Sequence, residues 1–391
     1  MAIRVCVLTS AHPPSDVRIF HKECKSLARQ GYEVTLVAPG AKLGLCEGIQ
    51  MRHVPVYAHR LDRVMWGSLA VYRQARLQNA DIYHFHDPEL IPVGLLLRLA
   101  GKKVVYDVHE DLPRTFSYKS YLPRVLRTAA SKLAEVIENS TSRLFSALIL
   151  ANPAVVERFS RVNQRSAVVH NYPKIEEIQG PPPESHSTYQ QKRDFLYVGM
   201  RITCARGAEE MIKAIGLLPP SLNARLKLVG AWDPPTLPAA LSKVPGWDRT
   251  DYFGLLGRAE VAGVLHQALA GLVVLHPEPN YVAAEPVKLF EYMCAGIPAI
   301  VADFPAYREI VERAGCGILV NPLDPQEIAQ AMTFLSTNPA QAEAMGRRGF
   351  EAVQREYNWA REELALFQIY RHLSGPATGR LAGTADSRSS A

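Results

Sequence analysis

Short apolar runs alternate with longer amphipathic segments along almost the whole chain, and this alternation limits the fold more than any other feature. The short runs have the length of buried strands, and the segments between them have helical spacing. A regular strand–helix alternation is typical of a parallel sheet covered by helices on both faces. We therefore predict an α/β fold made of doubly wound parallel sheets.

The expected strands fall into two groups. Those of the first group are Ile3–Leu8, Glu33–Val37, Ile82–Phe85, Lys103–Asp107, Ala147–Leu150 and Ala167–Val169. Helices are expected between them at Asp16–Gln30, Val64–Asn79, Glu89–Ala100 and Leu122–Phe145. The strands of the second group are Phe195–Val198, Arg225–Val229, Tyr252–Phe253, Gly271–Leu275, Ala299–Val301 and Gly317–Val320. Each group is large enough to form its own sheet.

A change of composition separates the two groups. Residues 174–193 (KIEEIQGPPPESHSTYQQKR) hold three consecutive prolines and few apolar groups, as linkers do. A length of 391 residues with 48% hydrophobic composition also exceeds one ordinary core. We predict domains over 1–173 and 194–355, a C-terminal helix over 356–373 that crosses back to the first domain, and a disordered tail over 374–391.

Composition restricts the class of protein further. The six cysteines contain no C-x-x-C pair, which disfavours a zinc knuckle and a disulfide framework and fits a reducing cytoplasm. No apolar run approaches the ~18 residues of a spanning helix, so we expect a cytoplasmic protein that is soluble or peripheral at the inner face of the membrane. The net charge of +6 is mild for this length, and no nucleic-acid partner is expected.

Basic residues follow the first strand of the second group. The segment GMRITCARG places Arg201 and Arg206 on a loop that leads into a helix near Ala208. In doubly wound sheets, ligands bind outside the carboxyl ends of the strands. Guanidinium groups beside unpaired N–H groups of a helix start favour a phosphate or carboxylate. The alternative is a solvated loop.

A short helix is predicted between Pro286, which suits a first helical position, and Gly296, which suits the residue after a helix. Its apolar side would be buried, yet it carries Lys288 in its first turn and Glu291 about one turn later. An anion at the helix start and a diol at the carboxylate would match the phosphates and ribose of a nucleoside diphosphate. The alternative is a surface Lys288–Glu291 pair.

These segments resemble glycosyltransferase family 4, retaining enzymes of the GT-B fold. VGMRITCARG resembles the family's R-x(4)-K-G phosphate loop, and EPVKLFEYMCAGIPAIVAD resembles its E-x(7)-E helix and following strand. In the first half, HPPSDVRIFHKECKSLARQGYEVTLVAPG, DIYHFHDPEL and VVYDVHEDLP are also similar to family members. The resemblance extends to about residue 373. It implies two Rossmann-like domains that face each other across a crevice, with the acceptor on the first and the donor on the second.

The resemblance implies a donor site in the second domain. Arg201 and Arg206 would hold the diphosphate and Glu291 the ribose, and Ala283 stands where the family has its first glutamate. Glu285 and Glu278 are nearby substitutes, so Glu278 is a candidate sugar contact. The full set of expected donor-binding residues is Arg201, Arg206, Gly254, Arg258, Glu285, Pro286, Val287, Lys288 and Glu291.

The first domain is expected to hold the acceptor. Ser15 and Asp16 would cap the helix after the first strand and are candidate acceptor or sugar contacts. Arg18 in the first turn of that helix is either a substrate contact or part of a surface ion pair. His109 matches the family's strand-end histidine near the donor sugar, so it joins Arg201, Arg206 and Glu291 as a candidate catalytic residue.

Several histidines and carboxylates at the strand ends could pass for metal ligands. They are His84, His86, Asp87, His109, Glu110 and Asp111. The chain has no D-x-D pair, and the resemblance implies chemistry without a metal, so we expect neither metal nor cofactor. His86 is instead a candidate acceptor or sugar contact.

The resemblance implies retaining transfer of a sugar from a nucleoside diphosphate donor, such as a UDP- or GDP-sugar, in polysaccharide or glycoconjugate assembly. The leaving phosphate would take the acceptor's proton, and the enzyme would position the substrates and stabilise charge. A nucleotide-sugar epimerase and a non-catalytic nucleotide-sugar binder remain alternatives.

Residues 114–132 bear on the acceptor, because they include five basic residues and no acidic one. Apolar residues recur there at helical spacing. Such a helix either lies on an anionic membrane surface, which would favour a lipid-linked acceptor over a soluble glycan, or packs its apolar stripe on the sheet.

Overall fold

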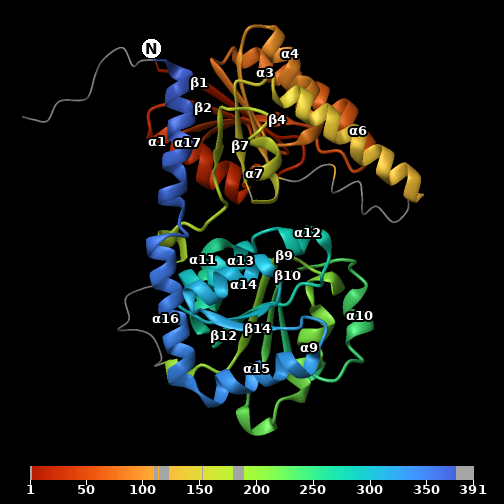
Figure 1. Cartoon of the computed structure of the whole chain (residues 1–391), viewed down its shortest axis with the longest axis vertical. Helices are drawn as coiled ribbons and strands as arrows, with labels where there is room; N and C mark the ends of the chain where they lie inside the picture. Colours follow the sequence, from red (N-terminus) through yellow and green to blue (C-terminus); the bar gives the residue numbers. More distant parts are fainter. Residues whose placement is uncertain (1, 110–112, 114–122, 152, 179–188, 376–391) are drawn as a thin grey trace, which may run out of the picture.

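The computed structural model describes residues 2–109, 113, 123–151, 153–178 and 189–375. They form two α/β domains that lie end to end, with the last two helices running along one side of both (Figure 1). The expected tail over 374–391 lies outside the described residues apart from its first two positions.

The first domain is built on an eight-stranded sheet in the order β3-β4-β2-β1-β5-β6-β7-β8, parallel except for β3. Its strands are β1 (Arg4–Leu8), β2 (Glu33–Pro39), β3 (Gly44–Cys46), β4 (Ile49–Val54), β5 (Ile82–Phe85), β6 (Lys103–Val108), β7 (Ala147–Leu150) and β8 (Ser166–Val168). The chain moves outward from β1 to β4 and then returns to β5 on the other side of β1. This reversal is the switch point of a doubly wound sheet, as the alternation predicted.

Two strands of this sheet were not expected from the sequence. The strand β3 is three residues long and fully exposed, and β4 has only three buried positions. Strands that are short or half exposed in this way lack the continuous apolar run by which the other six were recognised.

The helices of the first domain follow the predicted alternation with one change. The expected helix over Asp16–Gln30 is a π-helix followed by one turn of α-helix, and Asp16 caps it by accepting hydrogen bonds from two backbone N–H groups. The elements are η1 (Val17–Cys24), α1 (Lys25–Arg29), α2 (Arg60–Asp62), η2 (Arg63–Gly67), α3 (Ser68–Gln78), η3 (Pro88–Leu90), α4 (Ile91–Leu99), α6 (Arg124–Ser142) and α7 (Pro153–Phe159). The linker that follows holds the short helix α8 (Ile175–Ile178).

The second domain is built on a six-stranded parallel sheet in the order β11-β10-β9-β12-β13-β14. Its strands are β9 (Phe195–Ile202), β10 (Leu226–Trp232), β11 (Thr250–Gly254), β12 (Ala270–Val273), β13 (Ala299–Ala302) and β14 (Gly317–Val320). All six were predicted, and the switch point lies between β9 and β12.

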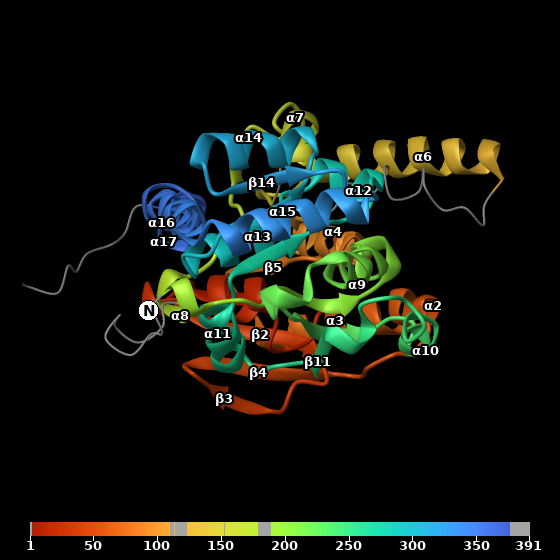
Figure 2. The ribbon, with the colours of Figure 1, turned by 90° about the horizontal axis from the view of Figure 1, so that it is seen from below.

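Helices cover both faces of the second sheet (Figure 2). They are η5 (Tyr189–Gln191), η6 (Cys204–Arg206), α9 (Ala208–Leu217), η7 (Pro220–Leu222), α10 (Leu237–Leu241), η8 (Trp247–Arg249), α11 (Arg258–Gln267), α12 (Pro279–Ala283), α13 (Val287–Cys294), α14 (Pro305–Ala314), α15 (Pro325–Thr337) and α16 (Pro339–Arg355). The short helix α13 begins one residue later than expected and buries Leu289, Phe290 and Met293.

The two domains are tied together by segments that leave one core and enter the other. The helix α17 (Trp359–Ser374) follows α16 and buries Trp359, Leu366 and Tyr370 in the core of the first domain (Figure 1). In the opposite direction, Tyr172 and Ile178 pack in the core of the second domain. Part of the expected linker is therefore a packed helix, and residues 179–188 of it lie outside the description.

Candidate active site

Residues from both domains meet in a cavity of about 180 Å³ beyond the carboxyl ends of the first sheet. It includes four residues that the sequence analysis selected, namely Arg18, His109, Glu285 and Val287, and it is completed by Ala151, Asn171, Tyr172, Ala284 and Phe290. Strand-end residues and the start of α13 thus border one crevice between the domains.

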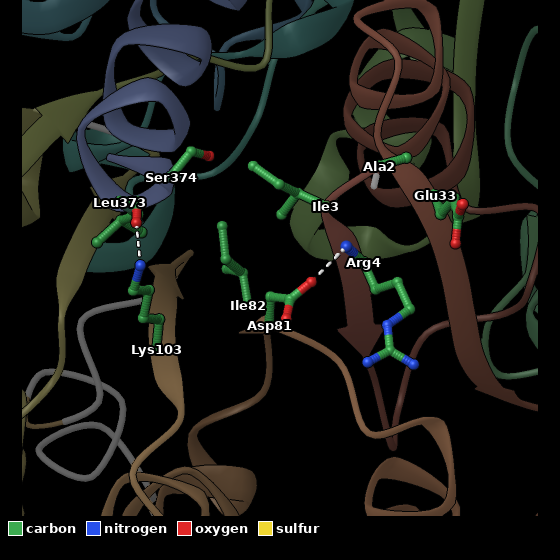
Figure 3. Close-up of a pocket in the computed structure, with 9 residues that line it drawn as sticks. All are labelled: Ala2, Ile3, Arg4, Glu33, Asp81, Ile82, Lys103, Leu373 and Ser374. Atoms are coloured by element: carbon green, nitrogen blue, oxygen red, sulfur yellow. Dashed lines mark hydrogen bonds between the residues drawn. The ribbon is translucent and has the colours of Figure 1, made fainter. Parts of the chain in front are cut away.

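A larger cavity, of about 620 Å³, lies at the opposite end of the first sheet (Figure 3). It is lined where β1, β5 and β6 begin and where α17 ends, and Lys103 donates a hydrogen bond to the carbonyl of Leu373 there. Ligands of open α/β sheets bind at the carboxyl ends of the strands. We therefore place the candidate active site in the interdomain crevice.

Two cations lie close together in the second domain, and one of them, Lys288, follows Val287 of the crevice lining. The ammonium of Lys288 is 4.0 Å from the ring centre of Tyr197, and the guanidinium of Arg206 is 5.7 Å from that of Tyr281. Lys288 is only 8% exposed, and its Nζ has no hydrogen-bond partner among the described residues. Burial and the nearby Arg206 charge lower the pKa of Lys288 to about 7, against the opposing charge of Glu291. An unpaired buried cation is costly, so this place is suited to an anion.

Local backbone geometry holds the two cations. Gly207 has a φ of +78°, and a side chain there would meet the carbonyl of Val274 at 2.2 Å, so the turn between η6 and α9 requires glycine. Thr203 caps the preceding turn by accepting the N–H of Arg206. Lys288 is the second residue of α13 and lies where the positive end of the helix dipole adds to its charge.

Arg201 is placed differently from Arg206. Its side chain is 68% exposed and forms an ion pair with Asp233 at 2.9 Å. The structure thus brings Arg206 and Lys288 together and directs Arg201 to the rim. Its expected contact with a diphosphate stays a prediction and would require the Asp233 pair to open or to be shared.

Glu291 lies among charges from both domains. Burial raises its pKa, while the charges of Lys22, Arg258 and Lys288 lower it. Lys22 belongs to η1 of the first domain and donates to Asn171 Oδ1 at 2.6 Å, and Arg258 forms an ion pair with Glu177. Glu291 is therefore not in the simple surface pair with Lys288 that was the alternative.

Glu285, an expected donor contact, already has partners. It accepts hydrogen bonds from His170 at 2.8 Å and from Tyr172 at 3.3 Å, so it joins the crossover segment to the start of α13. Glu278 is exposed and precedes α12, of which Ala283 is the last residue. Neither carboxylate occupies the position of Ala283.

The first domain contributes a buried cluster of charged groups under the crevice. Arg18 is 3% exposed, and its guanidinium is 2.9 Å from both Glu23 and Asp107. The surface ion pair that we considered for Arg18 is therefore a buried one, although Arg18 also reaches the interdomain cavity. Ser15 is exposed, and Asp16 acts as the helix cap.

His109 lines the crevice and is held from below by His86. His86 Nδ1 lies 2.9 Å from His109 Nε2, and the His86 side chain has no exposed surface. The expected contact of His86 with acceptor or sugar stays a prediction, and in this structure its ring, just after β5, is buried in the domain. Burial lowers the pKa of His109 to about 4, although Asp107 opposes the shift, so this imidazole is neutral near pH 7.

The residues considered as metal ligands are distributed over different sites. Asp87 accepts from Thr9 Oγ1 at 2.7 Å and pairs with His12 at 3.0 Å, whereas Glu110 and Asp111 lie outside the described residues. Polar atoms of Glu23, His84, His86 and Asp107 do lie within 4.8 Å of one another. The Arg18 guanidinium already contacts both carboxylates of this group. The expectation of no metal remains a prediction.

Sequence reasoning missed Glu23, Asp107 and the aromatic partners Tyr197 and Tyr281. The signal for the first two was present, because Asp107 interrupts the apolar run VVYDV and Glu23 lies on the buried side of an expected helix. The rings carry no such signal, since Tyr197 in β9 and Tyr281 in α12 are aromatic residues of the kind that ordinary strands and helices pack.

Comparisons with known proteins follow this geometry. A model of a glycosyl transferase 4-like domain matches residues 17–172, and a model of glycosyl transferases group 1 matches residues 182–352. The two models together cover most of both domains. The chain belongs to the family 4 type of glycosyltransferases.

Relatives of this glycosyltransferase are distant. An uncharacterized glycosyltransferase of Methanocaldococcus jannaschii is 22% identical, over 95% of this chain and 100% of its own length. A glycogen synthase of Mycobacterium tuberculosis is 26% identical, but the match spans only 31% of this chain and 28% of that protein.

Solved structures confirm the fold. A sucrose-phosphate synthase from Thermosynechococcus elongatus superposes with a TM-score of 0.77 at 18% identity, over 96% of this chain and 99% of the other. An Anabaena protein in complex with UDP and glucose gives a TM-score of 0.71 at 14% identity, over 94% and 99%. The glycosyltransferase therefore has the predicted GT-B architecture. Among its described residues, no helix is long and apolar enough to cross a membrane.

Proposed function

We propose that this glycosyltransferase transfers a sugar, with retention of configuration, from a nucleoside diphosphate sugar to a glycan or lipid-linked acceptor in polysaccharide or glycoconjugate assembly. The observation that carries the proposal is the pair Arg206 and Lys288, two adjacent cations with an unpartnered ammonium at the start of α13. A diphosphate would supply the missing anionic charge. The Anabaena protein of similar fold, solved with UDP and glucose, supports a donor of this class.

The chemistry would depend on positioning and on charge stabilisation. As the glycosidic bond breaks, negative charge grows on the diphosphate, where Arg206, Lys288 and the N–H groups of α13 stabilise it. The departing phosphate oxygen would take the proton of the acceptor hydroxyl as the new bond forms on the same face of the sugar. This scheme assigns no covalent nucleophile, cofactor or metal, and it is consistent with a cytoplasmic enzyme that uses a UDP- or GDP-sugar.

Acceptor dependence tests this proposal. UDP- and GDP-sugars are incubated with the protein, with and without a panel of glycan and lipid-linked acceptors, and released nucleoside diphosphate is measured. We expect release that requires an acceptor, and an anomeric configuration in the product, observed by NMR, that equals that of the donor. Interconversion of donor sugars without an acceptor would indicate an epimerase, and tight donor binding without any turnover would indicate a binding protein.

The ribose contact gives a separate prediction at Glu291. A carboxylate that accepts both ribose hydroxyls forms charge-assisted hydrogen bonds of about 1.5–3 kcal/mol each. Glu291→Gln is therefore expected to weaken UDP or GDP binding by roughly tenfold or more and to lose most of the preference for the ribo over the 2′-deoxy nucleotide. Calorimetric titration of both nucleotides measures this.

The matched control for Glu291 is the exposed Glu309 of α14. Glu309→Gln should bind both nucleotides as the wild type does. In addition, Ala283→Glu should change which donor sugar is used while leaving affinity for the nucleoside diphosphate nearly unchanged. If Glu291→Gln keeps the wild-type ratio of ribonucleotide to 2′-deoxynucleotide affinity, the ribose must bind elsewhere.

A membrane surface is proposed as the place where a lipid-linked acceptor is met, and α6 supports it. The helix extends from the side of the first domain in both views (Figures 1 and 2). Its buried positions include Ala134, Glu138 and Ser142, and Glu138 accepts from Tyr106 and Arg158. Its apolar side faces outward instead, with Val125, Leu126, Leu133, Val136 and Ile137 each 49–80% exposed.

This inverted arrangement bears on the two alternatives for residues 114–132, of which 114–122 lie outside the described residues. In its described part the apolar stripe does not pack on the sheet. The exposed stripe begins in this segment, which has five basic residues and no acidic one, and that composition fits an anionic lipid surface. The stripe continues past the segment at Leu133, Val136 and Ile137, next to the exposed Glu135. Arg127 of this segment is only partly exposed, and its Nε is buried.

Removal of this apolar face is expected to abolish membrane binding. Leu133→Glu combined with Ile137→Glu should eliminate sedimentation with vesicles that contain anionic phospholipid, because the substitutions place charge where acyl chains would be contacted. The melting temperature should change by only a few degrees. Leu77→Glu, at a leucine that is 75% exposed in α3, is the control and should sediment like the wild type. Equal sedimentation of all three proteins would exclude this surface.

A further inference from the structure

The chain passes from the first domain to the second over the short stretch 169–172. Val169 is buried in the core of the first domain, and Tyr172 is buried in the core of the second. Between them, the backbone N–H of His170 donates a hydrogen bond of 2.6 Å to Glu362 of α17, a helix whose buried residues belong to the first domain. The backbone of His170 is therefore held by the first domain.

The side chain of His170 is bound by the second domain instead. Its Nδ1 donates to Glu285 Oε2 at 2.8 Å, and the Tyr172 hydroxyl donates to the other oxygen, Oε1, at 3.3 Å. The rings of His170 and Tyr172 are stacked, with centroids 4.8 Å apart and an angle of 5° between their planes. Glu285 is thus bonded to two neighbouring side chains of the crossover, and its own side chain is only 17% exposed.

Glu285 leads directly into the candidate anion site. Pro286 is the cap of α13, Val287 is its first residue, and Lys288 follows. Glu285 and Val287 both line the crevice. The first N–H groups of a helix have no partner within the helix, so their use as an anion site depends on where the helix start is held. The bonds of Glu285 to the crossover fix that place from outside α13.

We propose that His170 and Glu285 are positioning residues that fasten the start of α13 to the domain crossover and so direct Lys288 toward the diphosphate. Glu285 then supports the donor site instead of contacting the donor sugar. This inference rests on the proposed function only in taking Lys288 as part of the diphosphate site.

The charges around His170 strengthen its bond to Glu285. The groups that face the ring are Glu285, Glu362 of α17, Arg18 of η1 and the stacked Tyr172. Burial alone would lower the pKa of His170, but the hydrogen bond and the charge of Glu285, with the charge of Glu362, raise it against the charge of Arg18. The protonated ring forms a charge-assisted hydrogen bond, which is stronger than a neutral one.

Hydrogen exchange of the amides of α13, followed by mass spectrometry, tests the fastening without any ligand. His170→Ala and Glu285→Ala should each speed exchange in α13 by roughly tenfold, the order expected when a hydrogen bond to a charged group is lost. The double variant should exchange no faster than either single one, because both substitutions remove the same bond. His170→Asn keeps a neutral donor near the position of Nδ1 and should restore much of the protection.

Glu363→Ala is the matched control, because the Glu363 side chain is also 17% exposed and pairs with Arg29 of α1 in the first domain. Its α13 should exchange like that of the wild type. No change in α13 in either His170→Ala or Glu285→Ala, or two changes that simply add in the double variant, would overturn the inference.

A second measurement without ligand covers the case in which the alanine variants fail to fold. Glu285→Gln has the same shape but no charge, so an NMR titration should show a lower pKa for His170 than in the wild type. The His170 signals are identified from their absence in His170→Asn. Glu363→Gln should leave that pKa unchanged. An unchanged pKa in Glu285→Gln would show that the two side chains are not coupled.

Nucleotide binding distinguishes support of the site from contact with the sugar. Whichever of UDP and GDP the wild type binds should bind more weakly, and by a similar factor, in His170→Ala and in Glu285→Ala, because both misplace Lys288. If Glu285→Ala weakens only the nucleotide sugar and His170→Ala changes nothing, Glu285 is a sugar contact and the positioning role is wrong. A wild type that binds no nucleotide would contradict the proposed function but leave the exchange and titration results standing, so the two failures are distinguishable.

Discussion

Alanine at Arg206 is expected to slow glycosyl transfer by roughly 100-fold or more, the loss seen when a charge-stabilising donor is removed from an active site. Donor binding in the ground state should weaken less, because charge on the diphosphate grows as the glycosidic bond breaks. The Arg206 guanidinium is hydrogen-bonded to the uncharged side chains of Tyr197 and Tyr281, so its removal breaks no ion pair with them. Single-turnover rates and donor titrations separate the two effects.

Arg201→Ala tests the second arginine expected at the diphosphate. We predict that it slows glycosyl transfer to a similar extent, although Arg201 is at present paired with Asp233 on the rim. Arg225→Ala is the control, because Arg225 precedes β10 at the amino end of the sheet and pairs with Asp251 at 2.7 Å. That variant should retain normal turnover. Near-normal turnover in both the Arg201 and Arg206 variants would place the diphosphate elsewhere.

Much of the architecture could be predicted from the sequence, because strand and helix periods are local. The six strands of the second sheet and the helix with Lys288 and Glu291 follow from apolar runs and from Pro286 and Gly296 at its ends. Strand ends then predicted which loops border the crevice, since parallel strands all end on one side. His109 does line the crevice, and Lys288 follows Val287, which also lines it.

The remaining features depend on contacts between distant segments. An amphipathic pattern predicts which residues form the apolar stripe of a helix, but not whether that stripe faces the domain or the solvent. In α6 the polar side is buried, because Glu138 finds Tyr106 and Arg158 and because Ala134 and Ser142 allow close approach. Likewise, nothing local to Glu23 or His86 indicates that η1 and β5 place them within reach of each other.

Replacement of Lys288 by methionine is expected to abolish donor binding while stabilising the free protein. Methionine keeps much of the volume beside Tyr197 but removes a buried ammonium that has no hydrogen-bond partner among the described residues. The melting temperature of the free protein should rise by roughly 5 °C or more, whereas the stabilisation given by saturating UDP or GDP should disappear. Thermal unfolding with and without nucleotide measures both.

The pH dependence of stability distinguishes this explanation from better packing. The pKa of Lys288 is about 7 in the folded protein and 10.5 as its ordinary value, so between these pH values the unfolded chain binds the extra proton. Lys288 therefore destabilises the fold most below about pH 7, and that cost is relieved as the pH rises toward 10.5. The gain from Lys288→Met should be largest at low pH and shrink at high pH. Lys213→Met, at a 43% exposed lysine paired with Glu209, should show no such trend.

Nucleotide affinity should depend on pH in the opposite direction to the stability of the free protein. A diphosphate beside Lys288 favours the ammonium and raises its pKa, so binding just above pH 7 must take up a proton. Calorimetry in buffers of different ionisation enthalpy should detect this uptake in the wild type and in Lys213→Met but not in Lys288→Met, if that variant retains measurable affinity. Affinity in the wild type should also fall as the pH rises above about 7, because the free enzyme then holds a neutral lysine. Two results together would contradict this explanation: nucleotide binding without proton uptake, and no stabilisation of the fold by Lys288→Met. They would show that the Lys288 ammonium is already compensated in the free enzyme and that the anion site lies elsewhere in the crevice.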